Sequence, residues 1–258
     1  MTRFPYRLIG MVHLLPLPGS PRAAASRDEI LSRARADAHA LEEAGFDALL
    51  IENYGDVPFR KERVEAHVIA DMTRIVLELR RACALPLGVQ VLRNDAAAGL
   101  GIAAATGAAF IRVNVHTGSM LTDQGLIEGR ADDTIRARRI LDADVRIFAD
   151  VLVKHAVPPA PIAIADAARD AVVRGCADAV IVSGRGTGEP TALLDVDAVR
   201  AAVSAPVLIG SGVTEANIVS LLARADGVIV GTSVKELGVT TNPVDADRAR
   251  ALVRAARG

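Results

Sequence analysis

The sequence predicts a single α/β domain that folds as a closed (β/α)8 barrel, the TIM barrel. Short runs rich in Val, Ile and Leu alternate with Ala-rich stretches of helical periodicity, which is the pattern of parallel strands joined by helices. The chain has 258 residues, of which 51% are hydrophobic, and this is close to the usual size of one such barrel. No linker divides the chain, so residues 1–258 are expected to form one domain.

Eight strands are expected, each a nearly continuous apolar run, because the strands of a parallel sheet are covered on both faces. They lie near residues 7–13, 47–53, 87–92, 109–115, 145–153, 177–183, 206–211 and 226–232. Eight parallel units of this length favour closure into a barrel. A doubly wound open sheet is the alternative fold.

Local chemistry places the intervening helices. Ser26 is followed three residues later by Glu29, which is a capping box, and Gly45 ends the apolar stripe that comes after it. The second helix is expected at about residues 60–81, where apolar residues recur at helical spacing. The connection after the fourth strand, residues 116–133, is much longer than usual and predicts a lid or a binding loop.

Composition argues against several classes of partner. The formal net charge is -1, and aromatic residues make up 3% with no Trp, so neither a basic field nor stacking platforms for nucleic acid are expected. No apolar run approaches the roughly 20 residues of a membrane span, which predicts a cytoplasmic protein without an integral membrane segment. Cys83 and Cys176 are expected to be reduced packing residues. Association into a homo-oligomer stays open.

Two glycine-containing loops predict a phosphate site. In phosphate-binding barrels, the loops after the last two strands hold a phosphoryl group with backbone N–H donors. Here these loops contain Gly210, Ser211, Gly212, Gly231, Thr232 and Ser233. Lys235 is expected either to add charge or to be a solvated lysine. A third loop, which begins with Ser183 and Gly184, carries Arg185 as a candidate anion clamp.

Polar and ionisable residues end the other strands, and their number predicts a reactive centre at the same end of the barrel. Asp95 is also expected to cap the third helix. The candidate catalytic residues are His13, Glu52, Asn114, His116, Asp150, Lys154 and His155.

Two chemistries fit these residues. Lys154 could form an imine with a carbonyl substrate, as in carbon–carbon lyases. Alternatively, Glu52, Asp150 and a histidine such as His155 could bind a divalent metal ion that polarises a carbonyl or an enediolate. No compact ligand motif selects the metal-ion hypothesis.

Seven segments carry a resemblance to a known family. They are IGMVHLLPLPGSP, DALLIENYGDVPF, VQVLRND, FIRVNVHTGSMLTDQGLIEG, ADVLVKHA, VSGRGTG and LIGSGVTEANI. In this order they resemble the BtpA family, also called BtpA/SgcQ, and the resemblance extends from about residue 8 to about residue 240.

The resemblance implies a barrel of the ribulose-phosphate-binding type and, through the family name, a role in photosystem I biogenesis at the thylakoid membrane. The family it resembles also has members in non-photosynthetic bacteria and archaea, and some members look like parts of sugar-utilisation systems, which implies an older activity. We therefore expect a metabolic enzyme of the lyase or isomerase type, acting on a phosphorylated sugar or a similar small phosphoester. The alternatives are a non-catalytic photosystem I assembly factor and a small-molecule sensor.

Overall fold

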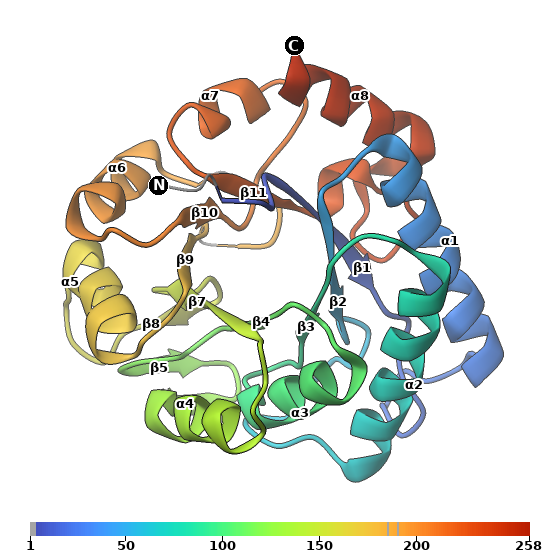
Figure 1. The fold of residues 1–258 in the computed structure, drawn as a ribbon, viewed down its shortest axis with the longest axis horizontal. Coiled ribbons are helices and arrows are strands. Elements are labelled where there is room, and N and C mark those ends of the chain that lie inside the picture. Colours follow the sequence, from blue (N-terminus) through green and yellow to red (C-terminus); the bar gives the residue numbers. More distant parts are fainter. Residues whose placement is uncertain (1–3, 185, 190) are drawn as a thin grey trace.

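The eight central strands form a closed barrel in a computed structural model that describes residues 4–184, 186–189 and 191–258 (Figure 1). Every neighbouring pair is parallel, in the order β1-β11-β10-β9-β7-β4-β3-β2 around the barrel. The strands are β1 (Leu8–His13), β2 (Ala48–Glu52), β3 (Leu87–Gln90), β4 (Phe110–Val113), β7 (Arg146–Val151), β9 (Ala179–Val182), β10 (Val207–Ile209) and β11 (Gly227–Val230). The predicted (β/α)8 barrel is confirmed, and the open sheet is not formed.

Helices surround the barrel, as Figure 1 shows. They are α1 (Arg27–Ala44), α2 (Ala66–Ala82), α3 (Ala96–Thr106), α4 (Ala131–Ile140), α5 (Ile164–Arg169) with the π turn η1 (Asp170–Arg174), α6 (Leu193–Ala202), α7 (Ile218–Leu222), the 3-10 turns η2 (Thr232–Val234) and η3 (Glu236–Gly238), and α8 (Ala246–Arg257). The predicted capping box is present, since Glu29 N–H donates to Ser26 Oγ and the Glu29 carboxylate accepts from Ser26 N–H. Gly45 ends α1 with φ 94°.

The prediction for the second helix was wrong at its start, because α2 begins at Ala66 and not near residue 60. The backbone before Ala66 bonds instead to the segment that follows β3. Arg93 N–H donates to Arg60 O, and Val64 N–H donates to Asp95 Oδ2 at 2.9 Å. The other oxygen of Asp95 accepts from Ala98 N–H at 2.9 Å, so this residue caps α3 as expected.

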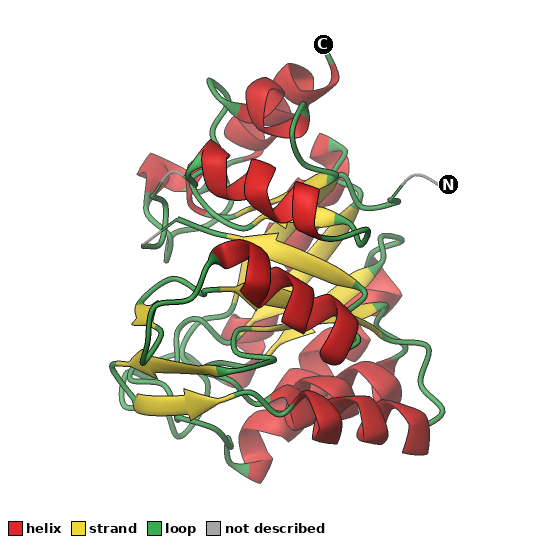
Figure 2. Ribbon diagram, turned by 90° about the vertical axis from the view of Figure 1, so that its left-hand side faces the viewer, coloured by secondary structure: helices red, strands yellow, loops and turns green. Residues whose placement is uncertain are grey.

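The long connection after β4 contains a hairpin, β5 (Ser119–Thr122) and β6 (Gly125–Glu128). Strand β8 (Ala156–Val157), from the connection after β7, pairs with β5 to complete a small antiparallel sheet. Figure 2 shows this sheet beside the barrel. Both segments leave the carboxyl ends of barrel strands, so the sheet lies at the barrel mouth.

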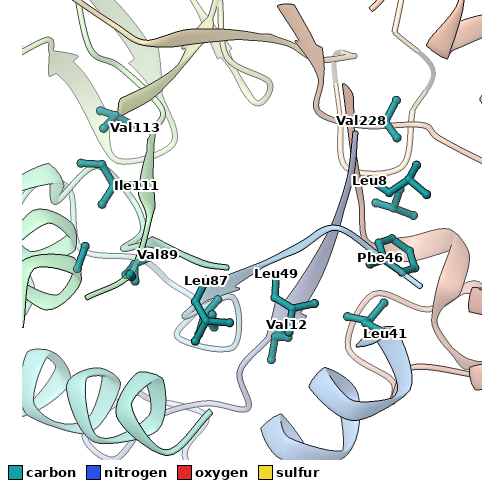
Figure 3. Packing of buried hydrophobic residues seen from close by; sticks show 14 of the residues in the cluster. Leu8, Val12, Leu41, Phe46, Leu49, Leu87, Val89, Ile111, Val113 and Val228 are labelled. Atoms are coloured by element: carbon teal, nitrogen blue, oxygen red, sulfur yellow. The ribbon is translucent and has the colours of Figure 1, made fainter. Parts of the chain in front are cut away.

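Side chains alternate between two hydrophobic layers along each barrel strand. One set points outward against the helices, and Figure 3 shows part of it, including Leu8, Val12 and Leu49. The other set points into the barrel and includes Ile9, Met11 and Leu50. Helical packing therefore uses one half of each strand, and the other half fills the barrel.

Two stacked phenylalanines, from β4 and β7, fill the barrel interior. The rings of Phe110 and Phe148 lie 4.6 Å apart at 18°, and Tyr6 packs 5.5 Å from Phe110. A Cβ on Gly88 would lie 2.1 Å from the Phe110 ring. Glycine at this position of β3 is what gives Phe110 room.

We expect Gly88→Ala to lower the free energy of unfolding by about 2 kcal/mol or more, since overpacking forces rigid neighbours to move. Urea titration followed by circular dichroism measures the change. Gly101→Ala is the matched control, because nothing lies within 4 Å of a Cβ there. In the helix interior it should stabilise by about 0.5–1 kcal/mol. Equal stability of the two variants would contradict this account of the barrel interior.

Candidate functional site

Strand alternation determines which side chains reach the barrel mouth. After the inward-facing Ile9 and Met11 of β1, the next inward position is His13, and after Ala48 and Leu50 of β2 it is Glu52. Strand register places His13 opposite Glu52, and Glu52 opposite Gln90 of β3. Three polar side chains therefore form a row at the carboxyl end of the barrel.

A cavity of about 310 Å³ opens at this end, within the size range of small-molecule sites. Its lining comes from both halves of the barrel. The first five barrel strands and the segments after them contribute His13, Glu52, Tyr54, Gln90, Arg93, Arg112, Asn114, Lys154 and His155. The segments after β10 and β11, together with α8, contribute Gly210, Ser211, Gly212, Gly231, Thr232, Ser233 and Arg248. The structure thus brings together most of the residues expected from the sequence.

His13 and Glu52 are buried beside each other, with His13 Nε2 3.8 Å from Glu52 Oε1. The His13 ring also packs against Tyr54, with ring centroids 4.8 Å apart. Burial, together with the positive charges of Lys235 and Lys154, holds the pKa of His13 well below its usual value, so this imidazole is neutral at neutral pH. Burial also raises the pKa of Glu52. The pair is suited to exchanging a proton with a ligand.

Lys154 follows β7 and lines the same cavity. Burial, and then the positive charge of Arg112, lowers the pKa of the Lys154 ammonium to about 8. Arg93 Nη2 donates to Lys154 O at 2.8 Å, which fixes the backbone of this lysine against the segment after β3. A lysine with this pKa supplies both an ammonium ion and a neutral amine near neutral pH.

Asp150 does not line the cavity, which corrects its expected direct role. Its carboxylate accepts two hydrogen bonds from Arg112, at 2.9 and 2.8 Å, and one from Asn114 Nδ2 at 2.8 Å. The side chains of the pair are 0% exposed for Asp150 and 3% for Arg112. A carboxylate this fully bonded positions and neutralises Arg112, because a buried guanidinium requires a counter-charge.

The expected role of His116 in the site is also corrected, because it does not line the cavity and its Nε2 lies 2.8 Å from Gly175 O. It ties the end of β4 to the segment after η1. His155 stays at the rim, where its Nε2 accepts from Thr187 N–H at 3.2 Å and lies 3.0 Å from Thr187 Oγ1. It joins the connections that follow β7 and β9.

The three candidate metal ligands do not form a metal site. Asp150 is bonded to Arg112 and Asn114, and His155 is bonded to Thr187 on the rim. Across the described residues, no group of three or more His, Cys, Asp and Glu side chains is arranged to hold a metal ion. The expected set of Glu52, Asp150 and His155 is therefore not assembled.

The two predicted phosphate loops meet at the cavity, and neighbouring glycines allow close approach. A Cβ on Gly231 would lie 3.0 Å from the His13 ring, and a Cβ on Gly210 would lie 2.5 Å from Ile181. Gly212 has φ 69°, a conformation that favours glycine. Thr232 and Ser233 begin η2, where the first N–H groups of a helical turn have no acceptor within it.

The third predicted loop reaches the cavity through Thr187 and Gly188 and not through its first two residues. Ser183 and Gly184 do not line the cavity, and Gly184 N–H donates to Ser211 Oγ at 2.8 Å. Ser211 Oγ in turn donates to Glu189 O at 3.1 Å. The hydroxyl of Ser211 thus joins two loops rather than facing a ligand. Arg185 lies outside the described residues.

Lys235 is neither a phosphate ligand nor a solvated lysine. Its side chain is 0% exposed, and Nζ donates to Asp37 Oδ2 of α1 at 2.8 Å. Asp37 Oδ1 also accepts from Val244 N–H at 2.8 Å. This buried pair fastens η2, which belongs to one of the two predicted phosphate loops, to the first helix.

Sequence reasoning missed several lining residues. Gln90 and Arg112 occupy inward positions of their strands, so the two-residue alternation was a usable signal for both. Tyr54 follows β2 without such a signal. Arg248 lies in α8, far along the sequence, and its Nε donates to Ser233 O at 2.9 Å. Only the packing of α8 on the mouth reveals that role.

Five buried polar atoms of cavity-lining residues have no hydrogen-bond partner. Buried polar groups are nearly always paired, so such a cluster points to a ligand that supplies the missing partners. The atoms are His13 Nδ1, Gln90 Oε1, Arg93 Nε, Asn114 Oδ1 and Ser233 Oγ. They come from both halves of the barrel and line one cavity.

Comparison with known proteins identifies the family. Residues 6–258 match the family model described as "BtpA family". The chain belongs to the BtpA family. It is 47% identical over 249 residues to the photosystem I biogenesis protein BtpA of Synechocystis sp., covering 96% of this chain and 87% of that protein. It is 48% identical over 247 residues to an uncharacterised protein of Pyrococcus furiosus, covering 96% of this chain and 93% of that protein.

Solved structures share the fold at low sequence identity. The thiamine phosphate pyrophosphorylase of Pyrococcus furiosus aligns with a TM-score of 0.60 and 14% identity, covering 98% of this chain and 96% of that enzyme. This likeness supports the barrel fold alone. Across the described residues, every helix falls short of the length and apolar character that a bilayer span requires.

We expect Asp150→Asn to lower the free energy of unfolding by about 3 kcal/mol, since removing one partner leaves the charge of Arg112 buried and uncompensated. Chemical denaturation provides the measurement. Asp247→Asn, which removes the exposed partner of Arg250, should leave the unfolding midpoint nearly unchanged. A stable Asp150→Asn protein would show that this carboxylate does not serve to neutralise Arg112.

Proposed function

We propose that this BtpA-family barrel is an enzyme that acts on a small phosphorylated molecule. The observation that carries the proposal is the set of unpartnered buried polar atoms around one cavity at the carboxyl end of the barrel. That end is where barrel enzymes place their active sites. The same cavity also contains glycine-rich loops, cationic side chains and the His13–Glu52 pair, and their occurrence together supports the proposal.

The phosphate group is proposed to lie against the loops after β10 and β11. Gly212 and Gly231 leave the backbone open there, Ser233 Oγ is free to donate, and Arg248 supplies positive charge at the same wall. The buried Lys235–Asp37 pair fixes η2 from behind. A preorganised anion site of this kind binds phosphate through backbone donors and one guanidinium.

The reaction is proposed to involve proton transfer next to a carbonyl group, as in aldol cleavage or isomerisation. His13 is neutral and can accept or donate a proton, and Glu52 lies 3.8 Å from it. The positive charges of Lys154 and Arg93 are suited to stabilising an enolate oxygen. Lys154, with its lowered pKa, is equally suited to imine formation with the same carbonyl.

A non-catalytic role in photosystem I assembly is the second candidate, and the printed name of the Synechocystis relative favours it. The archaeal relative is equally similar, so the similarity does not single out that role. An assembly factor needs no cavity lined by buried, unpartnered polar atoms. Ligand binding therefore separates the two candidates.

We expect inorganic phosphate and simple phosphomonoesters, tested one at a time, to raise the melting temperature. A ligand at one hundred times its Kd stabilises by about 2.7 kcal/mol. For a chain of this size that corresponds to roughly 5–10 °C. Differential scanning fluorimetry provides the measurement.

Gly231→Asp should abolish this shift, because it puts a carboxylate and a Cβ where the phosphate and the His13 ring lie. Gly101→Asp introduces the same side chain into open space on α3 and should keep the full shift. Equal shifts for both variants, or no shift for the unsubstituted protein with any phosphate compound, would favour the assembly role.

A further inference from the structure

The cavity has a second cationic region, across the mouth from the phosphate loops. In the circular order of eight strands, β3 and β4 lie diametrically opposite β10 and β11. Arg93 follows β3, and Lys154 follows β7, the other neighbour of β4. Both side chains line the cavity.

Neither of these two cations forms an ion pair within the part of the chain that the structure describes. Arg93 is 6% exposed, its Nη2 donates to the backbone oxygen of Lys154, and its Nε has no partner. The ammonium of Lys154 makes no ion pair or hydrogen bond with any side chain of the described residues. Of the other two lysines in the sequence, Lys235 pairs with Asp37 at 2.8 Å, and Lys61 lies 3.9 Å from Glu62.

The charges of Asp150, Asp123 and Glu52 all favour the charged form of Arg93, but none of these carboxylates forms an ion pair with Arg93 or Lys154. Asp150 neutralises Arg112, with two hydrogen bonds to its guanidinium. Glu52 is then the remaining carboxylate among the described lining residues, against Arg93 and Lys154 on this side of the cavity. Burying two cations that have no ion-pair partner among the described residues is costly unless a ligand adds negative charge.

A neighbouring atom, Asn114 Oδ1, can accept a hydrogen bond from a hydroxyl group. Asn114 Nδ2 donates to the Asp150 carboxylate, which can only accept, so the orientation of this amide is fixed. Asn114 Oδ1 is therefore an acceptor, and it is buried without a partner. A ligand hydroxyl would satisfy it, whereas a carboxylate or a carbonyl oxygen would not.

We propose that the substrate is a phosphorylated hydroxy acid, with its carboxylate held by Arg93 and Lys154 and a hydroxyl donating to Asn114 Oδ1. This inference rests on the proposed function, because it takes the phosphate to lie on the loops after β10 and β11. Of the two roles proposed for Lys154, it selects charge stabilisation by the ammonium ion over imine formation. The cavity volume of about 310 Å³ suits a compound with a short carbon chain. A phosphorylated alcohol without the carboxylate leaves the second cationic region unpaired.

Two probes with the same three-carbon chain test this inference. 3-Phosphoglycerate carries a phosphate, a hydroxyl and a carboxylate, and glycerol 3-phosphate replaces the carboxylate with a hydroxymethyl group. We expect 3-phosphoglycerate to bind at least tenfold more tightly by isothermal titration calorimetry. Lys154→Met should reduce that preference to about twofold and leave the affinity for glycerol 3-phosphate within a factor of three. Lys61→Met, at an exposed lysine, is the matched control and should retain the full preference.

The outcomes separate the two proposals. Equal affinity for both probes, with both lost in Gly231→Asp, would overturn the carboxylate site and leave the phosphate site standing. An unchanged preference in Lys154→Met would also overturn it. Binding of neither probe would overturn the phosphate site and, with it, this inference.

The pH dependence of the unsubstituted protein provides a measurement that needs no variant. The pKa of Lys154 is about 8, so the ammonium loses its proton as pH rises from 7 to 9, while a phosphomonoester with a pKa near 6 stays a dianion. The preference for 3-phosphoglycerate should therefore fall several-fold over this range. A preference that is constant from pH 7 to 9 would contradict the role of Lys154.

Discussion

The two-residue alternation of eight parallel strands is the constraint on which the rest of this structure depends. Each strand gives half of its side chains to the helices and half to the barrel interior. The inward half is apolar in the barrel interior, where Phe110 and Phe148 lie. It turns polar at the carboxyl ends of β1, β2 and β3, where His13, Glu52 and Gln90 are the last residues. The pairing of neighbouring strands places these three residues side by side, so their polar groups meet in one cavity.

The net charge of that cavity depends on which of its cations form ion pairs with carboxylates of the protein. Arg112 is buried in the barrel and is neutralised by Asp150, so the two residues form a rigid ion pair beneath the site. Lys235 and Asp37 form a second buried pair outside the barrel, which fastens the segment after β11 to α1. Arg93 and Lys154 have no such partner among residues 4–184, 186–189 and 191–258. The part of the cavity that lacks an internal counter-ion is the part available to an anionic ligand.

Family membership and fold constrain the function less than these side chains do. The BtpA family includes a protein named for photosystem I biogenesis and an archaeal protein of equal similarity, and the barrel is shared with enzymes at 14% identity. The same barrel supports unrelated chemistries, so the reaction depends on the site and not on the fold. A neutral histidine beside a carboxyl group, facing a lysine with a pKa of about 8, is an arrangement suited to proton transfer.

The sequence by itself determined the barrel, its eight strands, the cap of the first helix and the two glycine loops, because each depends on local periodicity or local backbone conformation. It also placed His13, Glu52 and Lys154 at the mouth, since residues at strand ends share one edge of a parallel sheet. It did not determine which of the polar residues would pair with one another. Tertiary structure turned Asp150 toward Arg112, His116 toward Gly175 and Lys235 toward Asp37, and it brought Arg248 of the last helix to the cavity. Buried charges are stabilised only by specific partners at short distance, and those distances exist only after the helices have packed on the barrel.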